Sequence, residues 1–363
     1  MVKSLLSDDN SLKKRPLFFY GAGNWCRKLM ESCQIIGMRP DFIVDRDSRI
    51  WGSTINGVSV ISPVEMQKSE SDCPVIISTY FIKSAELSLK EYGFHNLWHF
   101  PRVGDLIRCF GLSQEEIEQQ YQENYAIISN VAQNLADQRS VEVFNGNILR
   151  RRANWDNFED IADPDEYFCP DVIKLGENEV FLDGGGYDGR TTLDFIERTK
   201  GKFNHIYVFE PIPEMVGIIN ENLAHCMVKE KISVINAAID ERPNSVRFMS
   251  LGMGSHINAS GEIEVRAESI DDFFKDKEPP TYMTFDIEGA ELQAIRGANE
   301  TITRHKPKLA VSIYHKFNDL WEIPSFLMSK YLFYDIYIRH HYIGVLQTVC
   351  YAIPKEGYKV QLS

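Results

Sequence analysis

The stretch Val180-Phe-Leu-Asp-Gly-Gly-Gly-Tyr-Asp-Gly189 decides the fold of this chain. An apolar run meets an acid, Asp183, and then glycines, and residues 190–192 can begin a helix. This pattern predicts a buried parallel strand that turns tightly into a helix N-terminus. Because ligands of open α/β sheets bind at the carboxyl ends of the strands, we expect a binding site at this turn.

A second acid follows at a suitable distance. Residues 205–209 predict the next strand, which ends at Glu210. A carboxylate about 20 residues beyond such a turn can accept hydrogen bonds from both ribose hydroxyls of a nucleoside cofactor. Dinucleotide enzymes and S-adenosylmethionine enzymes both fit, but Asp183, Gly185 and Gly189 leave out the third glycine of G-x-G-x-x-G. Asp183 would repel a pyrophosphate and can hold a cationic methionine group, which favours the methyl donor.

The composition indicates a soluble globular protein. The chain has 363 residues, 44% of them apolar, and a net charge of −13. This length allows two domains, and the acidic charge argues against binding to nucleic acid or anionic membranes. The sequence predicts no membrane span, because it lacks a run of roughly 18 apolar residues. The acidic N-terminus and seven cysteines without a C-x-x-C pair favour a reducing, cytoplasmic location.

The N-terminal residues predict a small Rossmann-like βαβ unit. A strand runs into Gly21-Ala22-Gly23, a second strand ends at Asp45, and a third covers residues 74–78. Cys26 stands where a third glycine would allow close helix packing. Two interpretations stay open with equal weight: a degenerate fold kept for its shape or interface, or a nucleotide or nucleotide-sugar site at Gly21, Gly23 and Asp45.

The middle of the chain is rich in Glu, Gln and Asn. Apolar residues recur every three or four positions between residues 117 and 135, which predicts one long amphipathic helix. We expect this helix to bridge two domains, with a dimerisation helix, and so a homo-oligomer, as the alternative. The basic run Arg150-Arg151-Arg152 is typical of a solvated or acid-paired surface.

The catalytic candidates follow two later strands. Asp286 ends the predicted strand 282–286, and Glu288 and Glu291 come shortly after it. Asp286 and Glu288 can bind a divalent metal, and Asp286 can act as a general base. Glu291 is favoured as a helix-start acid. His315 follows the strand 309–313 and can act as a base or as a metal ligand.

A glycine-rich stretch, residues 252–256, predicts a lid over the cofactor. His256 at its end is a second-rank catalytic candidate.

The C-terminal half resembles the FkbM family of S-adenosylmethionine-dependent methyltransferases. The matching motifs lie at residues 179–189, 208–211, 285–291, 313–316, 321–324 and 338–342. The resemblance implies a Class I methyltransferase fold and O-methylation of a sugar or natural product. It places Asp183, Gly185 and Gly189 on the methionine side of the cofactor, Glu210 at the ribose, and Asn236 and Ala237 near the adenine. Gly186 and Tyr187 depart from the alanine or asparagine that many members carry in the glycine loop.

The N-terminal residues resemble a domain of bacterial sugar acyltransferases. The shared features are the Gly21-Ala22-Gly23 turn, an acid-rich stretch after the second strand and the stretch Asn56–Val60. The resemblance covers about 80 residues and implies a sugar-nucleotide partner.

The sequence therefore predicts an α/β protein with mostly parallel sheets. Residues 1–104 form a Rossmann-like domain, 105–170 a helical linker and 171–363 a methyltransferase domain. The expected activity is methyl transfer from S-adenosylmethionine to the hydroxyl of a sugar or nucleotide sugar. The alternatives are a nicotinamide-dependent sugar-nucleotide oxidoreductase, which lacks a convincing Tyr-x-x-x-Lys, and a non-catalytic scaffold with a methyltransferase fold.

Overall fold

The computed structural model describes residues 3–4, 14–23, 26–27, 29–30, 38–79, 82–99, 112–153, 158–249, 256–257, 263–341 and 346–356. The chain divides into two compact units, Met1–Val103 and Gly104–Ser363. Among the described helices, none is long and apolar enough to cross a membrane.

The first unit is built on a seven-stranded sheet in the order β1-β7-β6-β2-β3-β5-β4. All neighbouring pairs are parallel except β4 and β5. Its strands are β1 (Lys3–Ser4), β2 (Phe18–Tyr20), β3 (Phe42–Val44), β4 (Thr54–Ile55), β5 (Val58–Ile61), β6 (Val75–Ile77) and β7 (Leu97–His99). Its helices are η2 (Ser48–Ile50), α2 (Pro63–Met66) and α3 (Ile82–Glu91). The predicted Rossmann-like unit is therefore present.

Strands β1, β4, β5 and β7 were not predicted. The β4–β5 hairpin turns at Asn56 and Gly57, which have φ angles of 48° and 73°. An Asn-Gly pair with positive φ at both residues is the favoured two-residue hairpin turn. The sequence carried this signal within the stretch 56–60.

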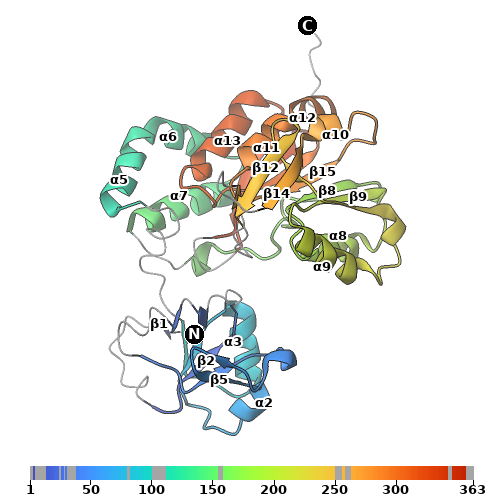
Figure 1. The fold of residues 1–363 in the computed structure, drawn as a ribbon. Helices are drawn as coiled ribbons and strands as arrows, with labels where there is room; N and C mark the ends of the chain where they lie inside the picture. The colour runs from blue at the N-terminus through green and yellow to red at the C-terminus, as the bar shows by residue number, and fades with distance from the viewer. Residues whose placement is uncertain are drawn as a thin grey trace. The chain divides into compact units, whose positions relative to one another are not determined.

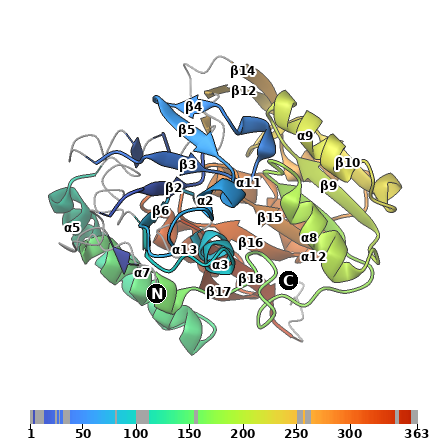
Figure 2. The same ribbon diagram turned by 90° about the horizontal axis from the view of Figure 1, so that it is seen from below.

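The second unit contains a seven-stranded sheet in the order β10-β9-β8-β15-β16-β18-β17. Strand β18 is antiparallel to both of its neighbours, and the other pairs are parallel. Figure 2 shows β10, β9, β15, β16, β18 and β17 across this sheet. The strands are β8 (Val180–Gly184), β9 (His205–Phe209), β10 (Ile232–Ile235), β15 (Tyr282–Phe285), β16 (Lys308–Ser312), β17 (Tyr334–His340) and β18 (Thr348–Pro354). The predicted strands and the reversed pair at the edge are confirmed.

The strand order changes direction beside β8. The chain leaves β8 for β9 on one side and later returns to place β15 on the other side. Parallel sheets of this kind bind ligands at such a switch point, outside the carboxyl ends of the strands. The glycine turn after β8 and Asp286 after β15 both lie at this point.

Helices cover both faces of the sheet. Residues of β8 alternate between two apolar clusters: Phe181 packs with α8 and α9, and Leu182 packs with α10 to α13. Because both faces are covered, β8 is buried along its whole length. Figure 1 shows α8 and α9 on one side of β8 and β15, and α11 and α12 on the other. The helices are α8 (Arg190–Thr199), α9 (Pro213–Leu223), α10 (Ile270–Phe273), α11 (Glu291–Gly297), α12 (Asn299–His305) and α13 (Asp319–Lys330), with short turns η3 (Glu159–Ile161) and η4 (Lys229–Lys231).

The prediction of one long helix after residue 105 is wrong. The structure has three helices, α5 (Gln114–Glu123), α6 (Tyr125–Asn134) and α7 (Gln138–Ala153). The first ends at Asn124, and the second ends before the extended residue Leu135. The expected apolar stripe is buried in the same core as α13 and β17, so these helices belong to the second unit.

The predicted acid pairing of the basic run at the end of α7 is present at two of its three arginines, but Arg150 and Arg151 are buried and do not form a surface. Arg150 pairs with Asp160, and Arg152 pairs with Glu118. Arg151 is fully buried and donates a hydrogen bond to the carbonyl of Phe317 at 3.1 Å.

A separate four-stranded sheet lies in the second unit, in the order β11-β14-β12-β13. Its strands are β11 (Ala238–Ile239), β12 (Asn244–Met249), β13 (His256–Ile257) and β14 (Ile263–Glu268). The predicted lid residues 252–255 lie outside the described residues.

Two glycine-to-alanine substitutions test the close approach of the ends of β8 and β15. In Gly185→Ala a Cβ would lie 2.0 Å from the carbonyl oxygen of Asp286, at a φ of 90°. We expect a loss of about 2–4 kcal/mol in the free energy of unfolding. The matched control is Gly217→Ala in α9, where a Cβ meets no atom within 4 Å, with an expected gain of up to about 1 kcal/mol. Urea denaturation measures both, and equal stabilities would contradict the geometry.

Candidate functional site

A pocket lies at the switch point, beyond the carboxyl ends of β8, β9 and β15. The empty space between its walls is about 630 Å³, which includes space open to solvent. Its polar lining comes from Gly185, Tyr187, Glu210, Asp286 and Glu288, and its apolar lining is Phe209, Pro211, Ile212, Met215, Ala237, Ala238, Ile239, Ile287 and Ala290. This combination of apolar walls and a few directed acids is typical of a binding site for a small polar molecule.

The glycine loop forms one wall of the pocket. The N–H groups of Gly185 and Gly186 both donate to the carbonyl of Phe209 at 3.0 Å, which binds the loop to the end of β9. A Cβ on Gly186 would lie 2.3 Å from Cγ1 of Val208. A side chain at residue 186 would therefore require Val208 to move.

Glu210 faces the pocket with a fixed carboxyl group. Its two oxygens accept hydrogen bonds from the N–H groups of Tyr187 at 2.9 Å and Ile212 at 2.8 Å. The residue is 5% exposed. Burial raises the pKa of Glu210 to about 7, although the two N–H donors favour the charged form. The carboxyl group is therefore held in place at the position predicted for ribose recognition.

Three predicted cofactor residues lie behind the pocket wall. Asp183 is 2% exposed and accepts hydrogen bonds from the hydroxyls of Thr192 at 2.7 Å and Thr284 at 3.3 Å. Burial raises its pKa to about 6. Gly189 is the N-cap of α8, and Asn236 donates to the carbonyls of Glu210 and Pro211. These residues hold the loops, while Gly185, Glu210 and Ala237 line the pocket.

Asp286 lies across the pocket from the glycine loop. Its Oδ2 accepts a hydrogen bond from the hydroxyl of Tyr167 at 2.8 Å, and its Oδ1 accepts one from the hydroxyl of Tyr314 at 2.9 Å. The side chain is 34% exposed. It is therefore a carboxylate that is both fixed and accessible, as a general base requires.

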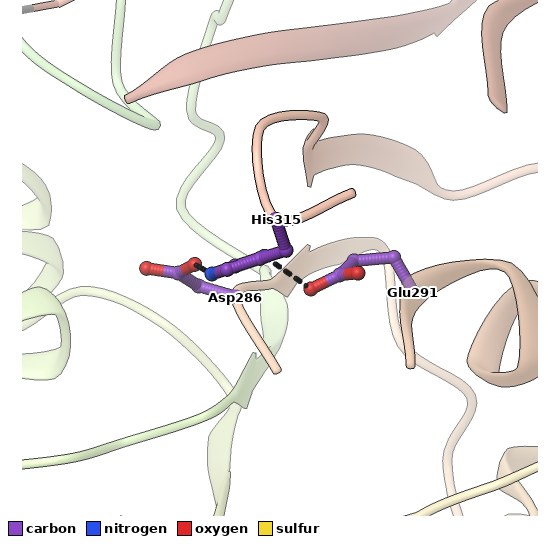
Figure 3. Close-up of side chains that lie close together, drawn as sticks. All are labelled: Asp286, Glu291 and His315. Atoms are coloured by element: carbon purple, nitrogen blue, oxygen red, sulfur yellow. Dashed lines mark ion pairs between the residues drawn. The ribbon is translucent and has the colours of Figure 1, made fainter. Parts of the chain in front are cut away.

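His315 lies between two carboxylates (Figure 3). Its Nε2 is 3.4 Å from Asp286, and its Nδ1 is 2.9 Å from Glu291. The Nδ1 makes no well-aligned hydrogen bond, so this contact is an ion pair. Burial opposes protonation, but the charges of Glu291, Asp286 and Glu288 raise the pKa of His315 to about 10. At neutral pH the imidazole is therefore an imidazolium and cannot accept a proton.

Glu291 is the first residue of α11, as predicted, and is fully buried. Burial raises its pKa, but His315 and the local N–H groups lower it further, so the net shift is downward. Its Oε1 accepts hydrogen bonds from the N–H groups of Ile287 and Gly289. Glu291 therefore fixes the turn after β15 and holds the imidazolium.

The spacing for a metal ion is present, but the arrangement suits a proton better. Ligand atoms of Asp286, Glu291 and His315 lie within 4.8 Å of one another. Figure 3 shows the imidazole ring between the two carboxylates. The predicted ligands Asp286 and Glu288 both face Nε2 of His315, at 3.4 and 3.5 Å. The imidazolium already supplies positive charge to these acids.

Sequence reasoning gave no role to three tyrosines at this site. Tyr187 lines the pocket, and Tyr167 and Tyr314 hold Asp286. Tyr314 could have been noticed because it precedes His315, whereas Tyr167 had no pattern that marked it. The side chain of the candidate His256 lies outside the described residues.

The N-terminal candidates Asp45 and Gly21 are hydrogen-bonded to nearby backbone groups of the first unit. Asp45 accepts hydrogen bonds from the N–H groups of Ala22 at 2.7 Å and Asp47 at 2.8 Å. Gly21, at a φ of 109°, donates to the carbonyl of Val44. Each oxygen of Asp45 therefore accepts one N–H bond, as each oxygen of Glu210 does. A ligand at Gly21, Gly23 and Asp45 stays a prediction, as does the resemblance to sugar acyltransferases.

Comparisons with known proteins agree with this fold. Residues 183–341 match the model of the methyltransferase FkbM domain. A methyltransferase FkbM from Methylobacillus flagellatus is similar in structure, with a TM-score of 0.60 and 20% identity, over 93% of this chain and 89% of that one. No curated protein matches the chain.

Two further solved structures are similar over half of the chain. They are an rRNA methylase from Streptococcus thermophilus (TM-score 0.32, 12% identity, 50% of this chain and 89% of that one) and fibrillarin from Aeropyrum pernix (0.34, 12%, 50% and 70%). The fibrillarin structure holds natively bound S-adenosyl-L-methionine. These two TM-scores are too low to support an inference.

The family match and the fold together support a methyltransferase. The predicted α/β class with a Rossmann-like methyltransferase fold is confirmed. The predicted FkbM resemblance is confirmed for residues 183–341.

Removing His315 tests the ion pairs. In the folded protein its pKa is about 10, against roughly 6.5 in an unfolded chain. The stability from its charge is therefore complete below about pH 6.5 and is lost as the pH rises toward 10. We expect His315→Gln to lose about 3 kcal/mol at pH 6 and less at pH 10. Urea denaturation at several pH values measures the difference, with exposed His225→Gln as the control, and a gap that does not shrink with pH would contradict the assignment.

Proposed function

We propose that this protein is an S-adenosylmethionine-dependent O-methyltransferase. The observation that carries the proposal is one pocket with two fixed acids, Glu210 on one side and Asp286 on the other. Each acid is held by its own hydrogen bonds, so the pocket can bind a nucleoside at one end and activate a hydroxyl at the other.

The residues of the pocket suit S-adenosylmethionine. The oxygens of Glu210 keep lone pairs for the ribose hydroxyls after accepting their two N–H bonds. Ala237, Ile212 and Met215 offer apolar surface for an adenine ring. The loop at Gly185 and the acids Asp286 and Glu288 offer a negative environment for the cationic methionine end. When bound, the cofactor supplies an electrophilic methyl group.

Asp286 is the proposed general base. It would hold the acceptor hydroxyl and take its proton as the oxygen forms a bond to carbon, so the substrate oxygen never carries a full negative charge. His315 is already protonated and cannot be this base; it stabilises the carboxylate from 3.4 Å. Of the two candidate bases, Asp286 and His315, only Asp286 can therefore take the proton in this proposal. The proposed reaction uses no metal ion.

We propose that the acceptor is a sugar, free or nucleotide-linked, and that the enzyme works in the cytoplasm. The FkbM resemblance supports a hydroxyl of a sugar or natural product. The side chain of Asp286 is 34% exposed, so such a molecule could reach the base from solvent.

Two variants separate cofactor binding from catalysis. We expect Glu210→Gln to bind S-adenosylhomocysteine at least about 10-fold more weakly than wild type, because an amide is a poorer acceptor for two ribose hydroxyls. Asp286→Asn should keep its affinity within about threefold. The pKa of Glu210 near 7 means that wild-type affinity rises between pH 6 and pH 8, and that of Glu210→Gln stays flat. Isothermal calorimetry measures this, and equal affinities of Glu210→Gln and wild type would reject the cofactor site.

Transfer of label tests the reaction itself. Wild-type protein with tritiated S-adenosylmethionine and a panel of nucleotide sugars should label at least one sugar, and Asp286→Asn should do so at least about 100-fold more slowly. An excess of EDTA should leave the rate unchanged. Binding of the cofactor with no label on any sugar or cell glycan would indicate a non-catalytic scaffold. A lower rate in EDTA would show that the reaction needs a divalent metal ion.

A further inference from the structure

We infer that Tyr167 and Tyr314 are positioning residues that aim the carboxylate of Asp286 at the acceptor hydroxyl. The inference rests on the proposed function and adds two residues to its machinery. Tyr167 precedes the part of the chain that matches the FkbM domain model, which begins at residue 183.

Each of the two phenols donates a hydrogen bond to a different oxygen of the Asp286 carboxylate. Tyr167 donates to Oδ2 at 2.8 Å, and Tyr314 donates to Oδ1 at 2.9 Å. A carboxylate that accepts one bond at each oxygen cannot rotate about its Cβ–Cγ bond without breaking both. Each oxygen retains lone-pair capacity for a substrate proton. The pair therefore fixes the direction of the base without using up its acceptor sites.

The hydroxyl of Tyr167 is itself oriented. It lies 3.2 Å from Oγ of Ser312, at the end of β16. Because the phenol proton points to Asp286, the serine hydroxyl is the donor in this second contact. The ring hydroxyl of Tyr167 is therefore fixed between Asp286 and Ser312.

The backbone of Tyr167 is held as firmly as its ring. Its φ is 63°, in the left-handed region that a large side chain rarely adopts. Its N–H donates to the hydroxyl of Tyr351 at 3.2 Å, and its carbonyl accepts a bond from the hydroxyl of Tyr282. A costly conformation persists only where the surroundings impose it, and such residues cluster at functional sites. Here the imposed conformation brings the phenol to Asp286.

Phenylalanine variants test the inference through Asp286. We expect Tyr167→Phe and Tyr314→Phe each to lower kcat about 10-fold or more, with KM for S-adenosylmethionine within about twofold. In the Asp286→Asn background the same changes should alter the residual rate by less than about twofold, because the carboxylate that they aim is gone. The matched control is Tyr331→Phe, which loses a hydroxyl contact to Asn299 at 3.2 Å and should keep full activity.

A second measurement needs no acceptor. Crystal structures of both variants with S-adenosylhomocysteine should show the Asp286 carboxylate rotated from its wild-type position. An unmoved carboxylate, or wild-type kcat in both variants, would overturn the inference while leaving the proposed function intact. Wild-type protein that binds cofactor but methylates nothing would reject the proposed function, and the crystallographic comparison would still decide whether the tyrosines aim Asp286.

Discussion

The contact on which the site depends is between two backbones, at the carboxyl ends of β8 and β15. A Cβ on Gly185 would lie 2.0 Å from the carbonyl oxygen of Asp286, so the two chain segments can meet only where one residue has no side chain. This approach places the loop after β8 and the acid after β15 on one pocket. The N–H bonds of Gly185 and Gly186 to Phe209 bring in the end of β9, and with it Glu210. The absence of a side chain at Gly185 therefore allows the ends of β8, β9 and β15 to meet at one pocket.

Charge is arranged around this contact in two ways. Glu210 has only N–H donors for its carboxyl group, and burial leaves it near its point of protonation at neutral pH. Asp286 and Glu291 instead share the imidazolium of His315, which neutralises part of their charge inside the protein. Glu210 can accept hydrogen bonds from the hydroxyls of a ligand, whereas the charges of Asp286 and Glu291 are partly neutralised by His315. The two ends of the pocket thus differ in what they can recognise.

The sequence predicted the main sheet because most of its strands are apolar runs, and those at its centre end in glycine or are followed by an acid, as at β8, β9 and β15. It also located Glu210 and Asp286, since an acid that ends a buried strand must lie at the ligand edge. It assigned Asp183 to the pocket, whereas Thr192 and Thr284 bind that carboxylate behind the wall. The single helix was wrong because Asn124 ends α5, a break that the apolar spacing does not show. Tyr167 meets Asp286 across 119 residues, and no local pattern encodes such a contact.

The role of His315 follows from what surrounds it rather than from its residue type. A histidine after a strand at the ligand edge is an obvious candidate base, but a base must be free of its proton at working pH. Three carboxylates around one buried ring make the protonated form the stable one. The role of the base is then left to Asp286, whose oxygens accept hydrogen bonds from Tyr167 and Tyr314, lie 3.4 Å from His315 and remain partly open to solvent. In this site the imidazolium holds Asp286, Glu288 and Glu291 together, and Asp286, partly exposed and held by two phenols, is left to react.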